Sequence, residues 1–187
     1  MATYKEIKGV TVQTRDTDPT VNVGSWASGG NLNTKRYGAF GFGIQTSAIL
    51  ATGFLPPPTT NVEQYDGSSW TEVANVNTQR ELGGACGTVT EGIIFGGTPG
   101  YKANTEDWNG SAWTETADLN TARGAGMGFG VSSQTLAYVA GTSYPSLPPY
   151  NTKTEAFNGS TWTEVNDLPN GRYHNKGGGS AASALTA

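Results

Sequence analysis

A repeated block with a fixed internal spacing constrains this chain more than any other feature. The 20 residues NVEQYDGSSWTEVANVNTQR at 61–80 return as NTEDWNGSAWTETADLNTAR at 104–123 and, slightly longer, as NTKTEAFNGSTWTEVNDLPNGR at 151–172. Part of the block also occurs at 24–36 as GSWASGGNLNTKR. Ten positions separate a tryptophan from an arginine in every copy, in the pairs Trp26 and Arg36, Trp70 and Arg80, Trp113 and Arg123, and Trp162 and Arg172. The interval between successive tryptophans varies instead from 43 to 49, which predicts packed units joined by loops of variable length.

The composition favours short strands over helices. Of 187 residues, 35% are hydrophobic and 14% charged, and 27 are glycine. The net charge is −4 and the 11 basic residues form no stripe, so we expect neither a nucleic-acid surface nor an anionic-membrane surface. The beginning MATYKEIKGV has no apolar signal core and no run approaches membrane-spanning length. We therefore expect a soluble protein, made in a cytoplasm and not inserted in a membrane.

Each unit follows one order, seen most completely in the second copy. A run of small residues (Leu82–Gly87) and a polar turn precede an apolar run that ends in glycine (Gly92–Gly97). A variable loop leads to a strand with the pattern Glu–x–aromatic, then to a DG or NG dipeptide, and then to the tryptophan strand. Such dipeptides predict a two-residue hairpin turn, because they tolerate positive φ. The pattern predicts four short antiparallel strands per unit.

These marks resemble those of kelch repeats: a glycine pair after the second strand, an aromatic residue before the turn, and a tryptophan in the fourth strand. Only Gly96-Gly97 keeps the full glycine pair. The resemblance covers residues 24–187 and implies an all-β fold, a β-propeller of four-stranded blades. Three complete blades are expected at about 37–75, 81–118 and 124–167.

The two ends of the chain complement each other in this scheme. The tail GGGSAASALTA aligns with GFGIQTSAILA of the first blade, so it supplies first and second strands. The front end offers the tryptophan strand at 24–33, with 8–14 as a candidate neighbour. Our hypothesis is a closing blade built from both termini, which gives four blades in one ring and removes open sheet edges. The alternative is an open arc that pairs with a second chain.

The recurring charged and aromatic residues have a structural interpretation. A glutamate lies seven positions before each of three tryptophans, and an arginine precedes each first strand. The first interpretation is a Glu–Arg network between strands or blades, since a buried charge needs a partner. The second is an arginine-ringed anion site on the axis. The tryptophans are expected to wedge between blades. The set comprises Glu63, Glu106, Glu155, Arg36, Arg80, Arg123, Arg172, Trp26, Trp70, Trp113 and Trp162.

The loops between second and third strands carry the candidate binding residues. They span 55–61, 98–104 and 142–151, hold most of the prolines, and present Tyr101, Tyr144, Pro148 and Tyr150. In a propeller they share one face with the loops that join blades. Rigid loops that present tyrosines form a preorganised contact surface. The alternative is that these are long loops with their own packing.

The sequence does not predict an enzyme. Some kelch-type propellers are copper oxidases, but a copper site needs several histidines, and this chain has only His174 and the single cysteine Cys86. Cys86 lies among small residues and is expected in the core. His174 has no nucleophile motif beside it, and glutamates that recur in register indicate a scaffold rather than a paired active site. We expect no catalytic residue, metal or cofactor.

The leader, residues 1–23, adds a second resemblance. MATYKEIKGVTVQTRDTDPTVNVG followed by SWASGGNLNTKR resembles the start of kelch-like proteins of bacteriophages of marine bacteria, whose repeats carry similar NTAR and NGSTW signatures. The resemblance implies a virion protein, and the leader would then be a docking strand with Tyr4 and Ile7 available to a partner. The alternative is an edge strand of the same propeller.

Together these features predict a non-enzymatic phage structural protein: a tail fibre, tail or capsid-decoration component that acts in virion assembly or host-surface attachment. The expected partners are other virion proteins and a host-surface polysaccharide or protein, with the chain oligomeric or present in many copies on the particle. The alternatives are a protein-interaction scaffold of cellular origin and a glycan-binding propeller.

Overall fold

The protein is built from β-strands. The computed structural model describes residues 28–124, 127–130, 136–141, 152–171, 177–180 and 183–186, and no helix occurs among them. The strands are β1 (Phe40–Ile44), β2 (Ser47–Ala51), β3 (Val62–Tyr65), β4 (Trp70–Val73), β5 (Gly84–Gly87), β6 (Gly92–Phe95), β7 (Thr105–Trp108), β8 (Trp113–Thr116), β9 (Met127–Gly130), β10 (Ala137–Ala140), β11 (Thr154–Phe157), β12 (Trp162–Val165), β13 (Gly177–Ser180) and β14 (Ser183–Thr186).

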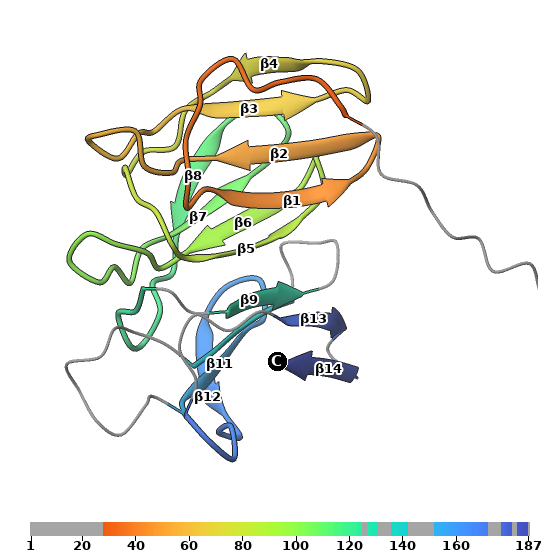
Figure 1. Cartoon of the computed structure of the whole chain (residues 1–187). Helices are drawn as coiled ribbons and strands as arrows, with labels where there is room; N and C mark the ends of the chain where they lie inside the picture. The colour runs from red at the N-terminus through yellow and green to blue at the C-terminus, as the bar shows by residue number, and fades with distance from the viewer. Residues whose placement is uncertain are drawn as a thin grey trace, which may run out of the picture.

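The strands form three four-stranded antiparallel sheets in chain order. The first sheet is β1-β2-β3-β4, the second is β5-β6-β7-β8 and the third is β9-β10-β11-β12, while β13 and β14 pair as a separate hairpin. Figure 1 shows the sheets following one another in space, with the second between the first and the third. Strand β5 contacts both β1 and β9, and β9 also contacts β13, so the first strands of successive sheets are neighbours. The predicted all-β class is confirmed.

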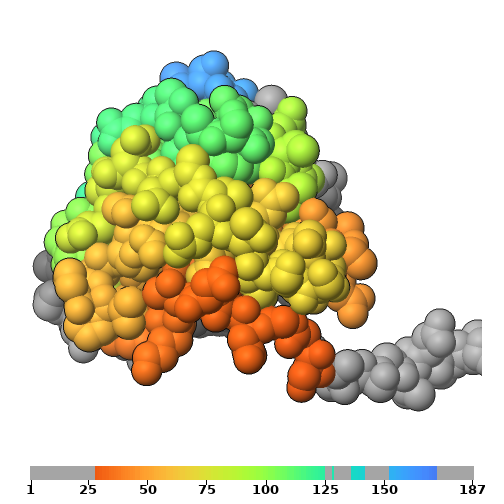
Figure 2. All heavy atoms as spheres, turned by 90° about the horizontal axis from the view of Figure 1, so that it is seen from above, coloured from red at the N-terminus to blue at the C-terminus, as the bar shows by residue number. Residues whose placement is uncertain are grey.

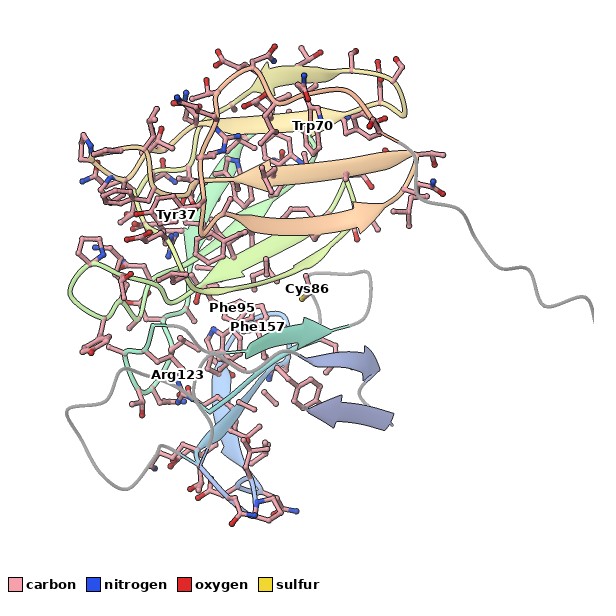
Figure 3. All side chains as sticks on the ribbon, viewed as in Figure 1. Tyr37, Trp70, Cys86, Phe95, Arg123 and Phe157 are labelled. Carbon is pink, nitrogen blue, oxygen red and sulfur yellow. The ribbon has the colours of Figure 1, made fainter. Side chains whose placement is uncertain are left out.

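The hydrophobic core lies between the sheets rather than inside any one of them. All four residues of β6 are buried, because the second sheet is covered on both faces. Ile94 points into a cluster shared with Phe42 of the first sheet. Its neighbour Ile93 points the other way, into a cluster shared with Phe157 of the third sheet. Alternation of side chains along a strand therefore joins three sheets into one packed body (Figure 3).

Glycine permits the close approach of the first strands. A Cβ added at Gly84 of β5 would lie 2.8 Å from the Cα of Gly128 in β9, and one added at Gly128 would lie 2.5 Å from the Cα of Gly84. Neither distance is compatible with a side chain. The small residues expected along the inner strands are thus a packing requirement at this contact.

The predicted two-residue hairpin turns are wrong. Tyr65 pairs with Trp70 across the sheet, which leaves a four-residue loop between β3 and β4. Asp66 closes it by accepting hydrogen bonds from the backbone N–H groups of Ser68 and Ser69, both at 2.8 Å. Those bonds, with the one from Ser69 the larger influence, lower the pKa of Asp66 to about 2. Asn109 and Asn158 accept equivalent bonds in the other sheets, so the aspartate or asparagine acts through its side-chain oxygen.

The glycine pair after the second strand marks two consecutive residues with positive φ. Gly96 and Gly97 have φ of 66° and 115°. Thr52 and Gly53 take the same conformations in the first sheet, at 57° and 112°. The backbone of this motif is therefore preserved where the first glycine is replaced by threonine, a residue that rarely adopts positive φ.

Candidate functional site

A buried carboxylate clasps the chain segment that enters each sheet. In the second sheet, Glu106 of β7 accepts hydrogen bonds from the backbone N–H of Asn77 at 2.7 Å and of Thr78 at 3.2 Å. It also accepts one from Asn77 Nδ2 at 3.0 Å and pairs with the guanidinium of Arg80. Arg80 donates in addition to the carbonyl of Asn104 at 2.7 Å. We call this unit of Asn, Thr, Arg and Glu the clasp.

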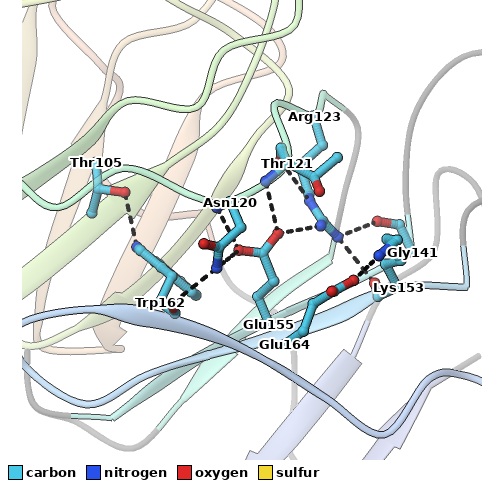
Figure 4. Close-up of polar contacts among 9 residues, drawn as sticks. All are labelled: Thr105, Asn120, Thr121, Arg123, Gly141, Lys153, Glu155, Trp162 and Glu164. Carbon is cyan, nitrogen blue, oxygen red and sulfur yellow. Dashed lines mark hydrogen bonds and ion pairs between the residues drawn. The ribbon is translucent and has the colours of Figure 1, made fainter.

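The clasp recurs in all three sheets. Glu155 accepts the same set of bonds from Asn120, Thr121 and Arg123, as the dashed lines in Figure 4 show. In the first sheet, Glu63 accepts from the N–H groups of Asn33 at 2.7 Å and Thr34 at 3.2 Å, and pairs with Arg36 at 2.9 Å. Seen from above in Figure 2, the described residues from 28 onward lie beside those of β3 and β4.

Each clasp within the series ties one sheet to the next. The carbonyl of Arg80 accepts a bond from Gly53 of the first sheet at 3.1 Å, while its side chain reaches Glu106 in the second. The carbonyl of Arg123 likewise accepts from Gly97 of the second sheet at 2.8 Å, and its side chain reaches Glu155 in the third. The spacing from tryptophan to arginine is constant because these residues form the connection from one sheet to the next.

Each clasp arginine is buried and paired with a carboxylate. The side chains of Arg80 and Glu106 are both 0% exposed. Burial lowers the pKa of Arg80, and the charge of Glu106 opposes that effect. Arg36 and Arg123 show the same directions with the same first cause. Each guanidinium is thus committed to a carboxylate, which supports the interpretation as a Glu–Arg network over an arginine-ringed anion site.

The tryptophans differ in how deeply they are buried between neighbouring sheets. Trp113 donates from Nε1 to the carbonyl of Ala74 at 3.1 Å and packs edge-on against Phe42 of the first sheet. Trp162 donates to Oγ1 of Thr105 and packs against a phenylalanine of the second sheet. Both are buried between sheets. Trp70 is only half-buried, and Nε1 donates to the carbonyl of Gly30 at 3.1 Å.

Exposed apolar side chains gather where the β2–β3 and β6–β7 loops meet the segments that enter the first strands. Tyr37 is 64% exposed and packs against Phe54 in a tilted arrangement, with 5.1 Å between ring centroids. Leu55, Leu82 and Tyr101 are 37%, 36% and 38% exposed. Backbone bridges join residue 37 to 54 and residue 81 to 98, so loop and entering segment form one surface in each sheet. We call this surface the apolar strip, and Figure 3 shows Tyr37 at this end of the sheets.

The sequence located only part of this surface. Tyr101 was predicted and lies on the apolar strip, whereas Tyr37, Leu55 and Leu82 were missed. Tyr37 follows directly after the clasp arginine Arg36, and Leu82 lies two positions after Arg80. The other predicted residues lie outside the part of the chain that the structure describes: Tyr4, Ile7, Trp26, Tyr144, Pro148, Tyr150 and Arg172, with the rest of the leader 1–23. His174 lies outside it as well.

The remaining groups of the described residues show no second site of reactive side chains. Cys86 is buried, and burial raises the pKa of its thiol to about 12. No three His, Cys, Asp or Glu side chains gather there as metal ligands. Within the same residues no helix is long and apolar enough to cross a membrane.

Comparison with known proteins adds no identification. No protein-family model and no curated protein matches the chain. The apolar strip and the clasps therefore stand on their geometry alone.

Proposed function

We propose that this protein is a non-enzymatic structural protein of a bacteriophage particle, a tail-fibre, tail or capsid-decoration component. Its role would be virion assembly or host-surface attachment, and its binding surface the apolar strip. The observation that carries the proposal is the exposure of Tyr37, Leu55, Leu82 and Tyr101 on one end of a rigid, clasped scaffold. Aromatic residues and few charges are typical of the centre of a protein interface. The resemblance of the leader to phage proteins supplies the virion context.

We propose further that the sheets are kelch-like blades of a β-propeller. The neighbouring first strands β1, β5, β9 and β13 support this, since such strands surround the axis of a propeller. A closing blade from both termini has support in one hydrogen bond. Trp70 donates to Gly30 just as Trp113 donates to Ala74, the residue that follows β4. Gly30 would therefore take the place of the residue that follows a fourth strand.

Ring closure and virion function have separate tests. For closure, light scattering should give a monomer for the full chain, and deletion of residues 173–187 should make it associate or aggregate. A monomeric deletion variant of unchanged stability would contradict the closing blade, and a full-length dimer would support the open arc.

For function, particles should be purified from infected cells by density-gradient centrifugation and washed in high salt. The chain is expected to remain with the coat and tail proteins in a fixed ratio. Tyr37→Ser with Tyr101→Ser should lower its incorporation or the attachment of particles to host cells. The matched control is Ile44→Ser, since Ile44 is 69% exposed at the opposite end of β1. A chain absent from washed particles would contradict the proposal and favour a cellular interaction scaffold.

A further inference from the structure

The clasp residues are the same in each sheet, but the two residues that follow the clasp arginine differ between the first and second sheets. The residue after the clasp arginine is Tyr37 in the first sheet and Glu81 in the second, and the next residue is Gly38 or Leu82. Gly38 and Leu82 share a left-handed backbone, with φ of 64° and 53°. Their conformation is thus common to both sheets, whereas their side chains are not. The framework is repeated and the apolar strip is specific to each sheet.

The backbone of the strip is strained at two of the four residues that expose a large apolar side chain. Leu82 has φ of 53° and Tyr101 has φ of 40°, in a region where glycine is the favoured residue. Such outliers cost about 1–3 kcal/mol each and cluster at binding sites. Leu82 occupies a position that Gly38 fills without strain in the first sheet. Strain retained at an exposed leucine indicates a role for that side chain outside the fold.

A carboxylate without a partner lies within the strip. Oε2 of Glu81 is buried and accepts no hydrogen bond from the described residues. It would lie 3.2 Å from a Cβ added at Gly38, and the side chain of Leu82 would lie 3.3 Å from the same point. Desolvation raises the pKa of Glu81. Glu106 accepts hydrogen bonds from four donors, whereas Oε2 of Glu81 accepts none from the described residues.

The chemistry of this place fits a cation with apolar neighbours. A guanidinium can pair with a carboxylate and at the same time stack on an aromatic ring, whereas an ammonium is a point charge with a stronger hydration shell. Glu81 offers the carboxylate, and Tyr37, at 64% exposure, offers the ring. Leu55, Leu82 and Tyr101 offer apolar surface around them. Arginine and aromatic residues are also the usual anchors of protein interfaces.

We propose that the apolar strip receives an arginine side chain, presented between apolar residues by a protein partner. The guanidinium pairs with Glu81 and stacks on Tyr37, and the flanking apolar residues contact Leu82 and Tyr101. The proposal rests on the proposed function, since it names the partner chemistry of the same surface. The guanidinium would give the Glu81 carboxylate an opposite charge, which that carboxylate does not have among the salt bridges of the described residues.

The test uses the full chain, labelled with nitrogen-15, and three probes. The first is the peptide acetyl-Leu-Arg-Leu-amide, the second has citrulline in place of arginine, and the third is the neutral oligosaccharide maltohexaose. Citrulline keeps the shape of arginine and removes its charge. The arginine peptide is expected to shift the backbone signals of Gly38, Leu82 and Tyr101 while those of Ile44 and Gly67 stay fixed. Citrulline should weaken binding about fivefold or more, the loss typical of a partly exposed ion pair with a cation–π contact.

The matched variant is Glu81→Gln. Because Oε2 of Glu81 accepts no hydrogen bond from the described residues, the variant should fold with a melting temperature equal to or above that of the parent. It should bind the arginine peptide about fivefold more weakly and so no better than the citrulline peptide. Glu115→Gln, an exposed glutamate on β8, serves as the control and should leave binding unchanged.

The outcomes separate this inference from the proposed function. Equal binding of the arginine and citrulline peptides, or full binding by Glu81→Gln, would overturn the assignment of an arginine. Shifts caused by maltohexaose alone would replace the protein partner with a glycan. If no probe binds while Tyr37→Ser with Tyr101→Ser still lowers incorporation into particles, the arginine inference fails and the virion function stands.

Discussion

Removal of the carboxylate from a clasp should destabilise the protein more than removal of its arginine. Glu106 accepts four hydrogen bonds, and Arg80 donates to only two acceptors, Glu106 and the carbonyl of Asn104. Arg80→Met leaves Glu106 with three donors from Asn77 and Thr78. Glu106→Met instead leaves a buried guanidinium with one carbonyl, and the N–H groups of Asn77 and Thr78 lose their acceptor.

The expected magnitudes follow from these contacts. Breaking a buried ion pair from one side costs about 3–5 kcal/mol of unfolding free energy, and each stranded polar group about 1–3 kcal/mol. Glu106→Met should therefore lie at the upper end, at about 5 kcal/mol or more, and Arg80→Met at the lower end, at about 3 kcal/mol, because Glu106 keeps three other donors. Glu106→Gln should lie between them, because the amide oxygen can still accept from Asn77 and Thr78. The double variant should recover only part of the loss, since those two N–H groups remain without an acceptor.

The assay is urea unfolding followed by tryptophan fluorescence and circular dichroism. Glu91→Met is the control: Glu91 is exposed immediately before β6 and is not part of a clasp, so its loss should change stability by less than about 0.5 kcal/mol. An Arg80→Met variant as unstable as Glu106→Met would refute the reasoning. It would mean that the ion pair alone, and not the capture of the entering backbone, holds the sheets together.

Four further predictions concern single positions. Thr52→Gly should stabilise the protein by about 1 kcal/mol, because Thr52 has φ of 57° and a buried hydroxyl that has no hydrogen-bond partner among the described residues. Urea unfolding measures this, and a loss of stability would contradict it. Gly128→Ala should lower the melting temperature, because its Cβ would lie 2.5 Å from the Cα of Gly84 and the clash should cost about 1–3 kcal/mol. Gly100→Ala, which meets nothing within 4 Å, should lose only about 1 kcal/mol for its positive φ, and equal losses would argue against the close approach of β5 and β9. Trp113→Ala should lose about 3–5 kcal/mol, measured by circular dichroism because one of the five tryptophans is removed, and a loss below about 1 kcal/mol would exclude its role as a wedge. Desolvation raises the pKa of Asp107 to about 6, so the folded state binds this proton more tightly than the unfolded state does. The free energy of unfolding should therefore fall as the pH rises from about 4 to about 6. Asp107→Asn should remove about 1 kcal/mol of that change, and an unaltered pH profile of the variant would count against the reasoning.

The repeat alone determines most of the strand arrangement. Four strands per unit, their order, and the limits of the three sheets follow from apolar runs, glycines and the recurring tryptophan. These are local signals, and they recur in register, so errors in one copy are corrected by the others. The turn between third and fourth strands was wrong because DG and NG suit both a two-residue turn and a longer loop closed by the aspartate or asparagine side chain.

The binding surface could be predicted only in part. Tyr101 stood out because it lies in a loop that breaks the period. Tyr37 and Leu82 did not, since they follow the clasp arginine and belong to the regular part of the unit. Their exposure depends on which way the entering segment turns after the clasp, and that is a property of two sheets together.

The sequence by itself determined the unit: which residues form strands, which glutamate, arginine and tryptophan recur, and at what spacing. Only the tertiary structure decided what those residues do for one another. Glu106 is bound in a clasp, whereas Oε2 of Glu81, in the segment that enters the same sheet, has no partner among the described residues. The recurring register predicted that glutamate pairs with arginine. It did not predict the backbone N–H donors, because these come from a segment about 30 residues away, and composition and period do not show which backbone groups a buried carboxylate will meet.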